Sequence, residues 1–154
     1  MDDIDKKLVS LLQQNSRMPL KTLAEQVFLS SPAVSARIER LEKANIIIGY
    51  EAKINKQKLG YTITAFINLE VLPSQKSDFY TFVRNCPNVL ECNCVTGNFS
   101  MLIKAAFKNT EELDSLIGRL QEFGKTNTQI VFSTPVEARG INLSMMEEGC
   151  EDEI

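Results

Sequence analysis

The spacing of hydrophobic residues changes near residue 60, and this change constrains the fold more than any other feature. Up to about residue 45, apolar residues recur every three or four positions, which is typical of amphipathic helices. In the stretch "YTITAFINLEV", which begins at Tyr61, they alternate with polar residues, as in a half-buried strand. We therefore expect an α+β protein in which helices come first and a sheet follows.

The first part of the chain predicts three helices. Asp2 and Asp3 are possible caps of the first helix, and Pro19 precedes the second. The third helix runs from Ser31 to Lys43, with Ser31 as its expected N-cap and Pro32 at the first helical position. Two helices, a tight turn and a third helix are the arrangement of a helix-turn-helix. After them, "IIIGYEAKI" predicts a strand and "NKQKLGY" a short turn that links two units.

The second part predicts the order β-α-β-β-α-β. Its strands are expected at 61–71, at the two ends of 88–107 around a turn at Gly97-Asn98, and at 128–138, with helices within 74–86 and 109–123. This order is that of a ferredoxin-like sandwich, in which two helices cover one face of an antiparallel sheet. The other face would carry Thr62, Thr64 and Phe66, a mixed surface that favours face-to-face dimerisation.

The third predicted helix has two different exposed halves. Projection at about 100° per residue puts Val34, Ile38 and Leu41 on the buried side. The opposite side has small residues at its beginning and basic residues at its end. It consists of Pro32, Ala33, Ala36, Arg40 and Lys43, flanked by Ser35 and Glu39. Small residues allow close approach to base edges in a major groove, and cations reach phosphates, so the pattern favours a DNA recognition helix. A partner-docking helix is the alternative, and Arg37, near the core edge, could pack or contact phosphate.

Charge is unevenly distributed along the chain. The net charge is −3, but residues 1–60 hold ten Lys/Arg against seven Asp/Glu, whereas residues 61–154 hold seven against thirteen. The positive field therefore lies with the predicted helix-turn-helix, as expected for a protein that binds nucleic acid.

Other functional classes find little support in the sequence. Cys86, Cys92, Cys94 and Cys150 fit neither a disulfide framework nor a zinc pattern, so we expect reduced thiols and no metal or cofactor. No apolar stretch approaches the roughly 20 residues of a membrane span, and the acidic start "MDDIDKK" argues against an export signal, so we expect a cytoplasmic protein. The absence of histidine argues against acid–base catalysis near neutral pH.

Two separate motifs resemble the Lrp/AsnC (feast/famine) family of transcription regulators. The stretch from "DDIDKKLVSLL" to "NKQKLGY" is similar to the family's DNA-binding half, and "VTGNFSMLIK" resembles the signature of its effector domain. The resemblance, from about Asp3 to Gly140, implies a winged helix-turn-helix, a strand linker and a ferredoxin-like RAM domain. It also implies homodimers that assemble into larger rings such as an octamer, with amino acids as common effectors bound between dimers, although the sequence does not distinguish a dimer from an octamer. A small-molecule sensor without DNA binding, or an enzyme like the siroheme decarboxylases that resemble this family, remain alternatives.

The resemblance assigns roles by position. Ser31 to Lys43 would be the recognition helix, in which Ser35, Arg37 and Arg40 match polar positions that face DNA. The effector residues would be Gly97, Asn98, Phe99 and Ser100, with Ser133 and Thr134 near the same pocket. The domains would span 1–60 and 61–140, before an acidic tail at 141–154, which we expect to be frayed.

This sequence departs from the family pattern at two positions. Phe28 stands where a glycine is usual in the turn before the recognition helix, and a left-handed conformation there would cost roughly 1 kcal/mol. Ser100 replaces a common aspartate, so an effector could be weakly bound, different or absent. A plain hairpin turn is the alternative for "TGNFS".

Overall fold

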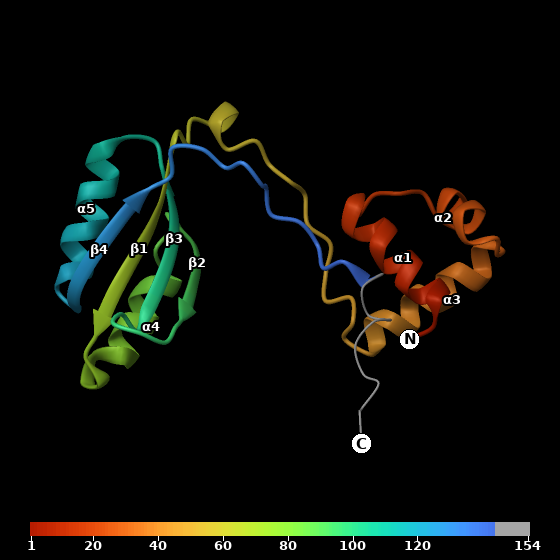
Figure 1. Cartoon of the computed structure of the whole chain (residues 1–154), viewed down its shortest axis with the longest axis horizontal. Helices are drawn as coiled ribbons and strands as arrows, with labels where there is room; N and C mark the ends of the chain where they lie inside the picture. The colour runs from red at the N-terminus through yellow and green to blue at the C-terminus, as the bar shows by residue number, and fades with distance from the viewer. Residues whose placement is uncertain (144–154) are drawn as a thin grey trace, which may run out of the picture. The chain divides into compact units, whose positions relative to one another are not determined.

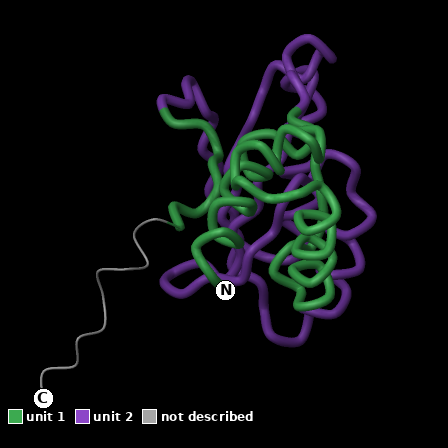
Figure 2. The backbone as a smooth tube through the Cα atoms, turned by 90° about the vertical axis from the view of Figure 1, so that its right-hand side faces the viewer, with its two compact units in different colours: residues 1–53, 136–154 green, residues 54–135 purple. Residues whose placement is uncertain are grey.

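The chain folds into two compact units, seen here in a computed structural model that describes residues 1–143. One unit comprises residues 1–53 and 136–143, and the other comprises residues 54–135 (Figure 2). The first unit thus ends before the predicted boundary at residue 60, and residues 136–143 group with the helices. Among the described residues, no helix is long and apolar enough to cross a membrane.

The helical unit contains three helices: α1 (Asp3–Gln14), α2 (Leu20–Val27) and α3 (Ser31–Lys43) (Figure 1). At the start of α1, Asp2 accepts a hydrogen bond from the Asp5 amide at 2.8 Å, while the Asp5 carboxylate accepts one from the Asp2 amide, which forms a capping box. The three helices share one apolar core, and its buried members are Leu8, Leu23, Ala24, Val27 and Val34. The predicted helix-turn-helix is therefore confirmed.

Helix α3 is capped one residue earlier than expected. Ser30, rather than Ser31, has the extended backbone of an N-cap, and its hydroxyl accepts a hydrogen bond from the Ala33 amide at 3.4 Å. The first hydrogen bond of the helix, from the Val34 amide to the Ser30 carbonyl, also identifies Ser30 as the N-cap. Pro32 is still tolerated, because an amide in the first turn has no intrahelical partner in any case.

The sheet unit has four antiparallel strands in the order β2-β3-β1-β4. The strands are β1 (Ile63–Val71), β2 (Val89–Cys94), β3 (Met101–Phe107) and β4 (Gly124–Ile130), and the helices are α4 (Lys76–Arg84) and α5 (Thr110–Gln121) (Figure 1). Two short 3₁₀ helices, η1 (Gln57–Leu59) and η2 (Pro73–Gln75), lie before β1 and α4. The element order and strand order are those of a ferredoxin-like sandwich, as predicted.

The alternation in β1 decides which face of the sheet is covered. Ala65, Ile67, Leu69 and Val71 are buried, and they form one core with residues of α4 and α5 such as Phe79. The residues between them point to the opposite face, which neither helix of the unit covers. We call this second surface the open face and define it by Thr64, Phe66, Asn68, Leu102 and Lys104.

Two predicted strands differ in the structure. Within the described chain, residues 46–54 form no strand, and the apolar side chains of Ile48 and Ile54 are 91% and 59% exposed. The last strand lies at Gly124–Ile130 rather than 128–138, because β4 pairs with β1 from Gly124 opposite Val71 to Ile130 opposite Ala65. Beyond Ile130, the Val131 amide donates one further hydrogen bond to the Thr64 carbonyl.

Candidate nucleic-acid interface

The solvent side of α3 combines small residues with cations. Pro32, Ala36, Arg40 and Lys43 are all exposed, and their spacing places them on one face of the helix. The opposite face is anchored by Val34 and Leu41, which are 0% and 2% exposed. Of the other predicted contact residues, Ser31, Ala33 and Ser35 are half-buried beside this face. We call this side of α3 the recognition surface, and define it by exposed Pro32, Ala36, Arg40 and Lys43 together with half-buried Ala33 and Ser35.

Arg37 belongs to an ion-pair network between α1 and α3. Its Nη1 lies 2.6 Å from a carboxylate oxygen of Asp2 and 2.8 Å from one of Asp5. The Nη2 of Arg40 lies 2.7 Å from the second oxygen of Asp5. Asp5, 2% exposed, is the only buried charged residue of the described chain, and the two arginines satisfy both of its oxygens.

This network gives the two arginines different roles. The side chain of Arg37 is 25% exposed and forms ion pairs with the carboxylates of both Asp2 and Asp5. It therefore fixes the orientation of α3 against α1. The side chain of Arg40 is 61% exposed, and a guanidinium has five N–H donors, so it can meet another anion while it contacts Asp5. The hydrogen bond from Arg37 lowers the pKa of the Asp2 carboxyl below its ordinary value.

Phe28, at the turn before α3, is left-handed. Its backbone angles are φ 56° and ψ 42°, which an L-residue with a side chain adopts at a cost of about 1 kcal/mol. The side chain is 90% exposed, and the Lys7 Nζ lies 5.8 Å from the ring centroid. The backbone cost expected for a left-handed residue at this position therefore applies to Phe28.

Ser100, in the turn that joins β2 to β3, makes its hydrogen bonds within the chain. Its hydroxyl accepts from the Val71 amide at 3.0 Å, and the hydroxyl and amide of Ser100 donate to the Leu69 carbonyl at 3.4 and 3.1 Å. Gly97 has a φ of 108°, a conformation that L side chains rarely adopt. Gly97 and Asn98 are exposed, whereas Phe99 and Ser100 are half-buried. Ser100 therefore ties the turn to the end of β1.

The other predicted effector residues lie at the opposite end of the sheet. Ser133 and Thr134 line a hollow of about 520 Å³ together with Phe66, Gln129, Ile130, Val131, Phe132 and Pro135. This hollow adjoins the beginning of β1, whereas Ser100 bonds near its end, and about five residues of strand, roughly 16 Å, separate the two places. Within one chain, the structure therefore does not bring the two groups into one pocket.

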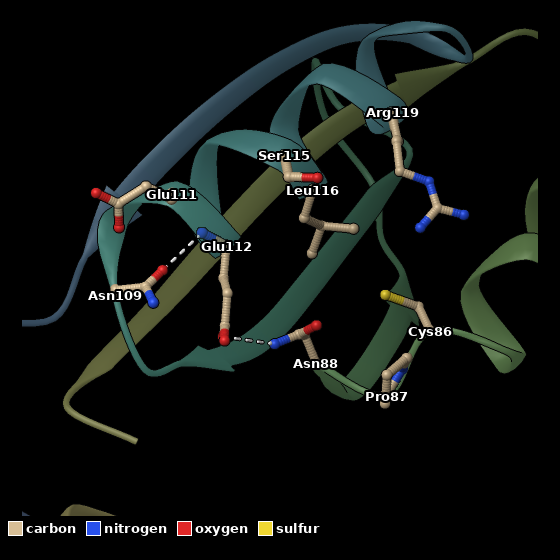
Figure 3. A pocket seen from close by; sticks show the side chains of 9 residues that line it. All are labelled: Cys86, Pro87, Asn88, Asn109, Glu111, Glu112, Ser115, Leu116 and Arg119. Carbon is tan, nitrogen blue, oxygen red and sulfur yellow. Dashed lines mark hydrogen bonds between the residues drawn. The ribbon is translucent and has the colours of Figure 1, made fainter. Parts of the chain in front are cut away.

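A second hollow, of about 440 Å³, lies between α5 and the segment before β2 (Figure 3). It is lined by Cys86, Pro87, Asn88, Asn109, Glu111, Glu112, Ser115, Leu116 and Arg119. The Glu112 carboxylate accepts hydrogen bonds from the Lys108 amide at 3.0 Å and from Asn88 at 3.4 Å, so it already has partners. None of the predicted effector residues lines this hollow.

The described cysteines are free thiols. Cys86 is buried in the sheet unit, and partial burial raises the pKa of Cys92, which disfavours the reactive thiolate. No group of three or more His, Cys, Asp or Glu that could hold a metal exists among residues 1–143. Cys150 lies outside the described residues.

Both units match known domains. Residues 1–42 match the AsnC-type helix-turn-helix domain, and residues 64–141 match the Lrp/AsnC ligand binding domain, which alone covers half of the chain. The chain belongs to the Lrp/AsnC family.

Several Lrp/AsnC relatives are similar over most of their length. The HTH-type transcriptional regulator FL11 of Pyrococcus furiosus is 31% identical over 89% of this chain and 93% of its own. Among solved structures, a transcriptional regulator of Neisseria meningitidis in complex with L-methionine has a TM-score of 0.89 at 26% identity, with 94% of this chain and 98% of that one covered. A feast or famine regulatory protein of Mycobacterium tuberculosis, also complexed with L-methionine, has a TM-score of 0.84 at 31% identity, with 91% and 97% covered.

In this Lrp/AsnC chain, sequence patterns do not predict one residue that holds the recognition surface in place. Asp5 was not singled out, although it holds both arginines of α3. Its only local signal is the spacing Asp2-x-x-Asp5 of the capping box. The ion pairs of Asp5 join residues more than 30 positions apart in the sequence. The spacing of apolar residues within one helix therefore cannot predict them.

Proposed function

We propose that this protein regulates transcription by binding duplex DNA through the recognition surface of α3. The observation that carries the proposal is that one face of α3 is anchored in the core, while the exposed face is small at its beginning and basic at its end. The relatives are named as transcriptional regulators, not enzymes, which supports a regulatory role. Such a protein acts on chromosomal DNA, so we expect it in the cytoplasm.

Each part of the recognition surface has a distinct role in this proposal. Pro32, Ala33 and Ala36 allow the helix backbone to approach base edges in the major groove. The Ser35 hydroxyl can exchange hydrogen bonds with a base or phosphate, and Arg40 and Lys43 neutralise phosphates. Arg37, with Asp2 and Asp5, holds the helix in orientation rather than reading bases.

Salt titration of DNA binding tests the proposal. We expect the logarithm of affinity to fall linearly with the logarithm of salt concentration, because bound cations displace counterions from DNA. Arg40→Ala should weaken binding and reduce this slope by about one, since one phosphate contact is lost. A DNA affinity that changes neither with salt concentration nor with Arg40→Ala would contradict the proposal.

An amino acid is the effector that we propose for the sheet unit, because two similar proteins are complexed with L-methionine. The proposed site uses Gly97, Asn98, Phe99 and Ser100 from one end of the sheet. Ser133 and Thr134 line the hollow at the other end, so a site that includes both groups needs a second copy of the chain.

Calorimetry with L-methionine tests the effector proposal. The Ser100 hydroxyl carries no charge to meet the ammonium group of an amino acid, so we expect weak binding by the natural chain. Ser100→Asp should bind more tightly, whereas the neutral control Ser100→Asn should not. Equal heats from both variants would contradict the role of this position.

The assembly that we propose is a homodimer formed through the open face, with four such dimers forming an octamer. Phe66 and Leu102 are apolar members of this face that the helices of the same chain do not cover, which favours a partner over water. A dimer would present two recognition helices to half-sites about one helical turn, 34–36 Å, apart.

A further inference from the structure

We propose that Phe28 is a DNA-contacting residue, whose ring makes apolar contact with deoxyribose or a thymine methyl group beside the recognition surface. The inference rests on the proposed DNA binding and adds a contact from the turn that precedes α3. It starts from a left-handed aromatic residue that the fold does not bury.

Nothing in the helical unit requires an aromatic side chain at this position. The ring is 90% exposed and stands outside the apolar core formed around Leu8 and Leu23. Glycine would adopt the observed φ of 56° without strain, and asparagine would adopt it more readily than phenylalanine does. A bulky residue held in a strained and exposed conformation points to a function outside the fold.

Phe28 lies close to the beginning of the recognition surface along the chain. It lies two residues before Ser30, the N-cap of α3, so their Cα atoms are at most about 7 Å apart. The first turn of α3, with Pro32 and Ala33, follows directly. A ring at this turn can contact the wall of a groove that the first turn of α3 enters, and Phe is one of the residues that contact the thymine methyl group.

Charge around the ring favours DNA over an apolar protein surface. The Lys7 Nζ lies 5.8 Å from the ring centroid. A cation beside an exposed ring is suited to a partner with apolar sugars next to anionic phosphates.

The test measures DNA affinity and thermal stability for the same variants of the full chain. The probe is a genomic DNA fragment selected by the wild-type protein, and affinity is measured by fluorescence anisotropy over a range of salt concentrations. Phe28→Gly and Phe28→Asn should each weaken binding by about tenfold, while the slope of affinity against salt stays unchanged because no phosphate contact is lost. The midpoint of thermal unfolding should not fall, since both residues relieve the backbone strain.

Two controls separate the ring from its backbone. Phe28→Tyr keeps an aromatic ring and should retain wild-type affinity within about twofold. Asn45→Gly changes the other described non-glycine residue with positive φ, at 54°, beyond the C-terminus of α3, and should leave affinity unchanged.

The outcomes separate this inference from the function on which it rests. If the wild-type protein selects and binds no duplex DNA, both fail. If the wild type binds, and both Phe28→Gly and Phe28→Asn bind within about twofold of it, the inference alone is wrong. A change in oligomeric mass with unchanged DNA affinity would assign the ring to a contact between protein copies, and would equally overturn the inference.

Discussion

At the scale of single residues, Asp5 determines how α3 is held against α1. It is buried, and two arginines of α3 donate to its oxygens at 2.8 and 2.7 Å. A buried carboxylate is tolerated only when its oxygens are satisfied, and here each partner is also anchored in α3. The orientation of the recognition surface against α1 therefore depends on this network.

Replacement of Asp5 by asparagine should destabilise the helical unit. We expect Asp5→Asn to reduce the free energy of unfolding by about 2 kcal/mol, because an amide cannot satisfy two guanidinium groups and leaves them with unmatched charge. Asp3→Asn is the control, since the Asp3 side chain is 84% exposed and its ion pair with Lys6 should contribute less than about 1 kcal/mol. Urea unfolding checks both variants, and equal effects would contradict the role of Asp5.

Asp2 should make stability depend on pH in the acid range. The hydrogen bond from Arg37 lowers the pKa of Asp2 in the folded chain below the ordinary value of 3.8. The unfolded state therefore binds the proton more readily, so the contribution to stability is present above pH 3.8 and is lost as the pH falls through the folded pKa. Asp2→Asn should reduce the loss of stability on acidification below about pH 4, as measured by thermal unfolding at each pH. An unchanged pH profile would contradict this assignment.

At the scale of secondary structure, two glycines of the sheet unit have opposite roles. Gly118 lies within α5, and a Cβ added there would have no neighbour within 4 Å. Gly124 begins β4 with a φ of 153°, and an added Cβ would lie 1.8 Å from the Glu70 carbonyl oxygen. The first glycine is thus dispensable, whereas the second allows β4 to begin against β1.

These two glycines form a matched pair for mutation. Gly118→Ala should increase the free energy of unfolding by about 0.5–1 kcal/mol, because alanine favours a helix interior. Gly124→Ala should decrease the free energy of unfolding by more than about 2 kcal/mol. The added Cβ would clash with the backbone of Glu70, and neither β1 nor β4 can move away without loss of the pairing between them. Chemical denaturation measures both, and a neutral Gly124→Ala would show that the close approach to Glu70 does not restrict this strand.

The success of sequence reasoning differed between elements for physical reasons. The bounds of α3 and the alternation in β1 could be predicted, because one buried face imposes its period on the sequence. The last strand was placed too late, because β4, "GKTNTQI", has little apolar signal, whereas the chain after it contains half-buried Val131 and exposed Phe132. Its location depends on pairing with β1, a distant segment.

The predicted strand at 46–54 failed for a different reason. Its isoleucines give a strong strand pattern, but no segment of the described chain pairs with it as a strand. A hydrophobic pattern indicates which conformation a segment favours. A strand also needs a neighbouring strand that pairs with its backbone N–H and C=O groups. The same limit applies to the effector site, because no local pattern could place Ser133 and Ser100 at opposite ends of β1.

At the scale of the whole molecule, dimerisation through the open face is directly testable. Phe66→Glu puts a charge into this face and should shift the protein to the mass of one chain in sedimentation experiments. Ser115→Glu introduces the same charge on the exposed side of α5 and should leave the mass unchanged. A monomeric wild type, or a Phe66→Glu variant that keeps the wild-type mass, would contradict the proposed dimer.

The proposed DNA binding requires that the beginning of α3, where the exposed side chains are small, approaches DNA. The most direct measurement compares the affinity of wild-type protein, Ala36→Glu and Ser115→Glu for a DNA fragment that the wild type selects. Ala36 is exposed, so glutamate there should not disturb the fold, but its bulk and charge should lower affinity by at least about a hundredfold against a negatively charged groove. Ser115→Glu should bind like the wild type. Equal affinity of all three proteins would show that the exposed face of α3 does not contact DNA.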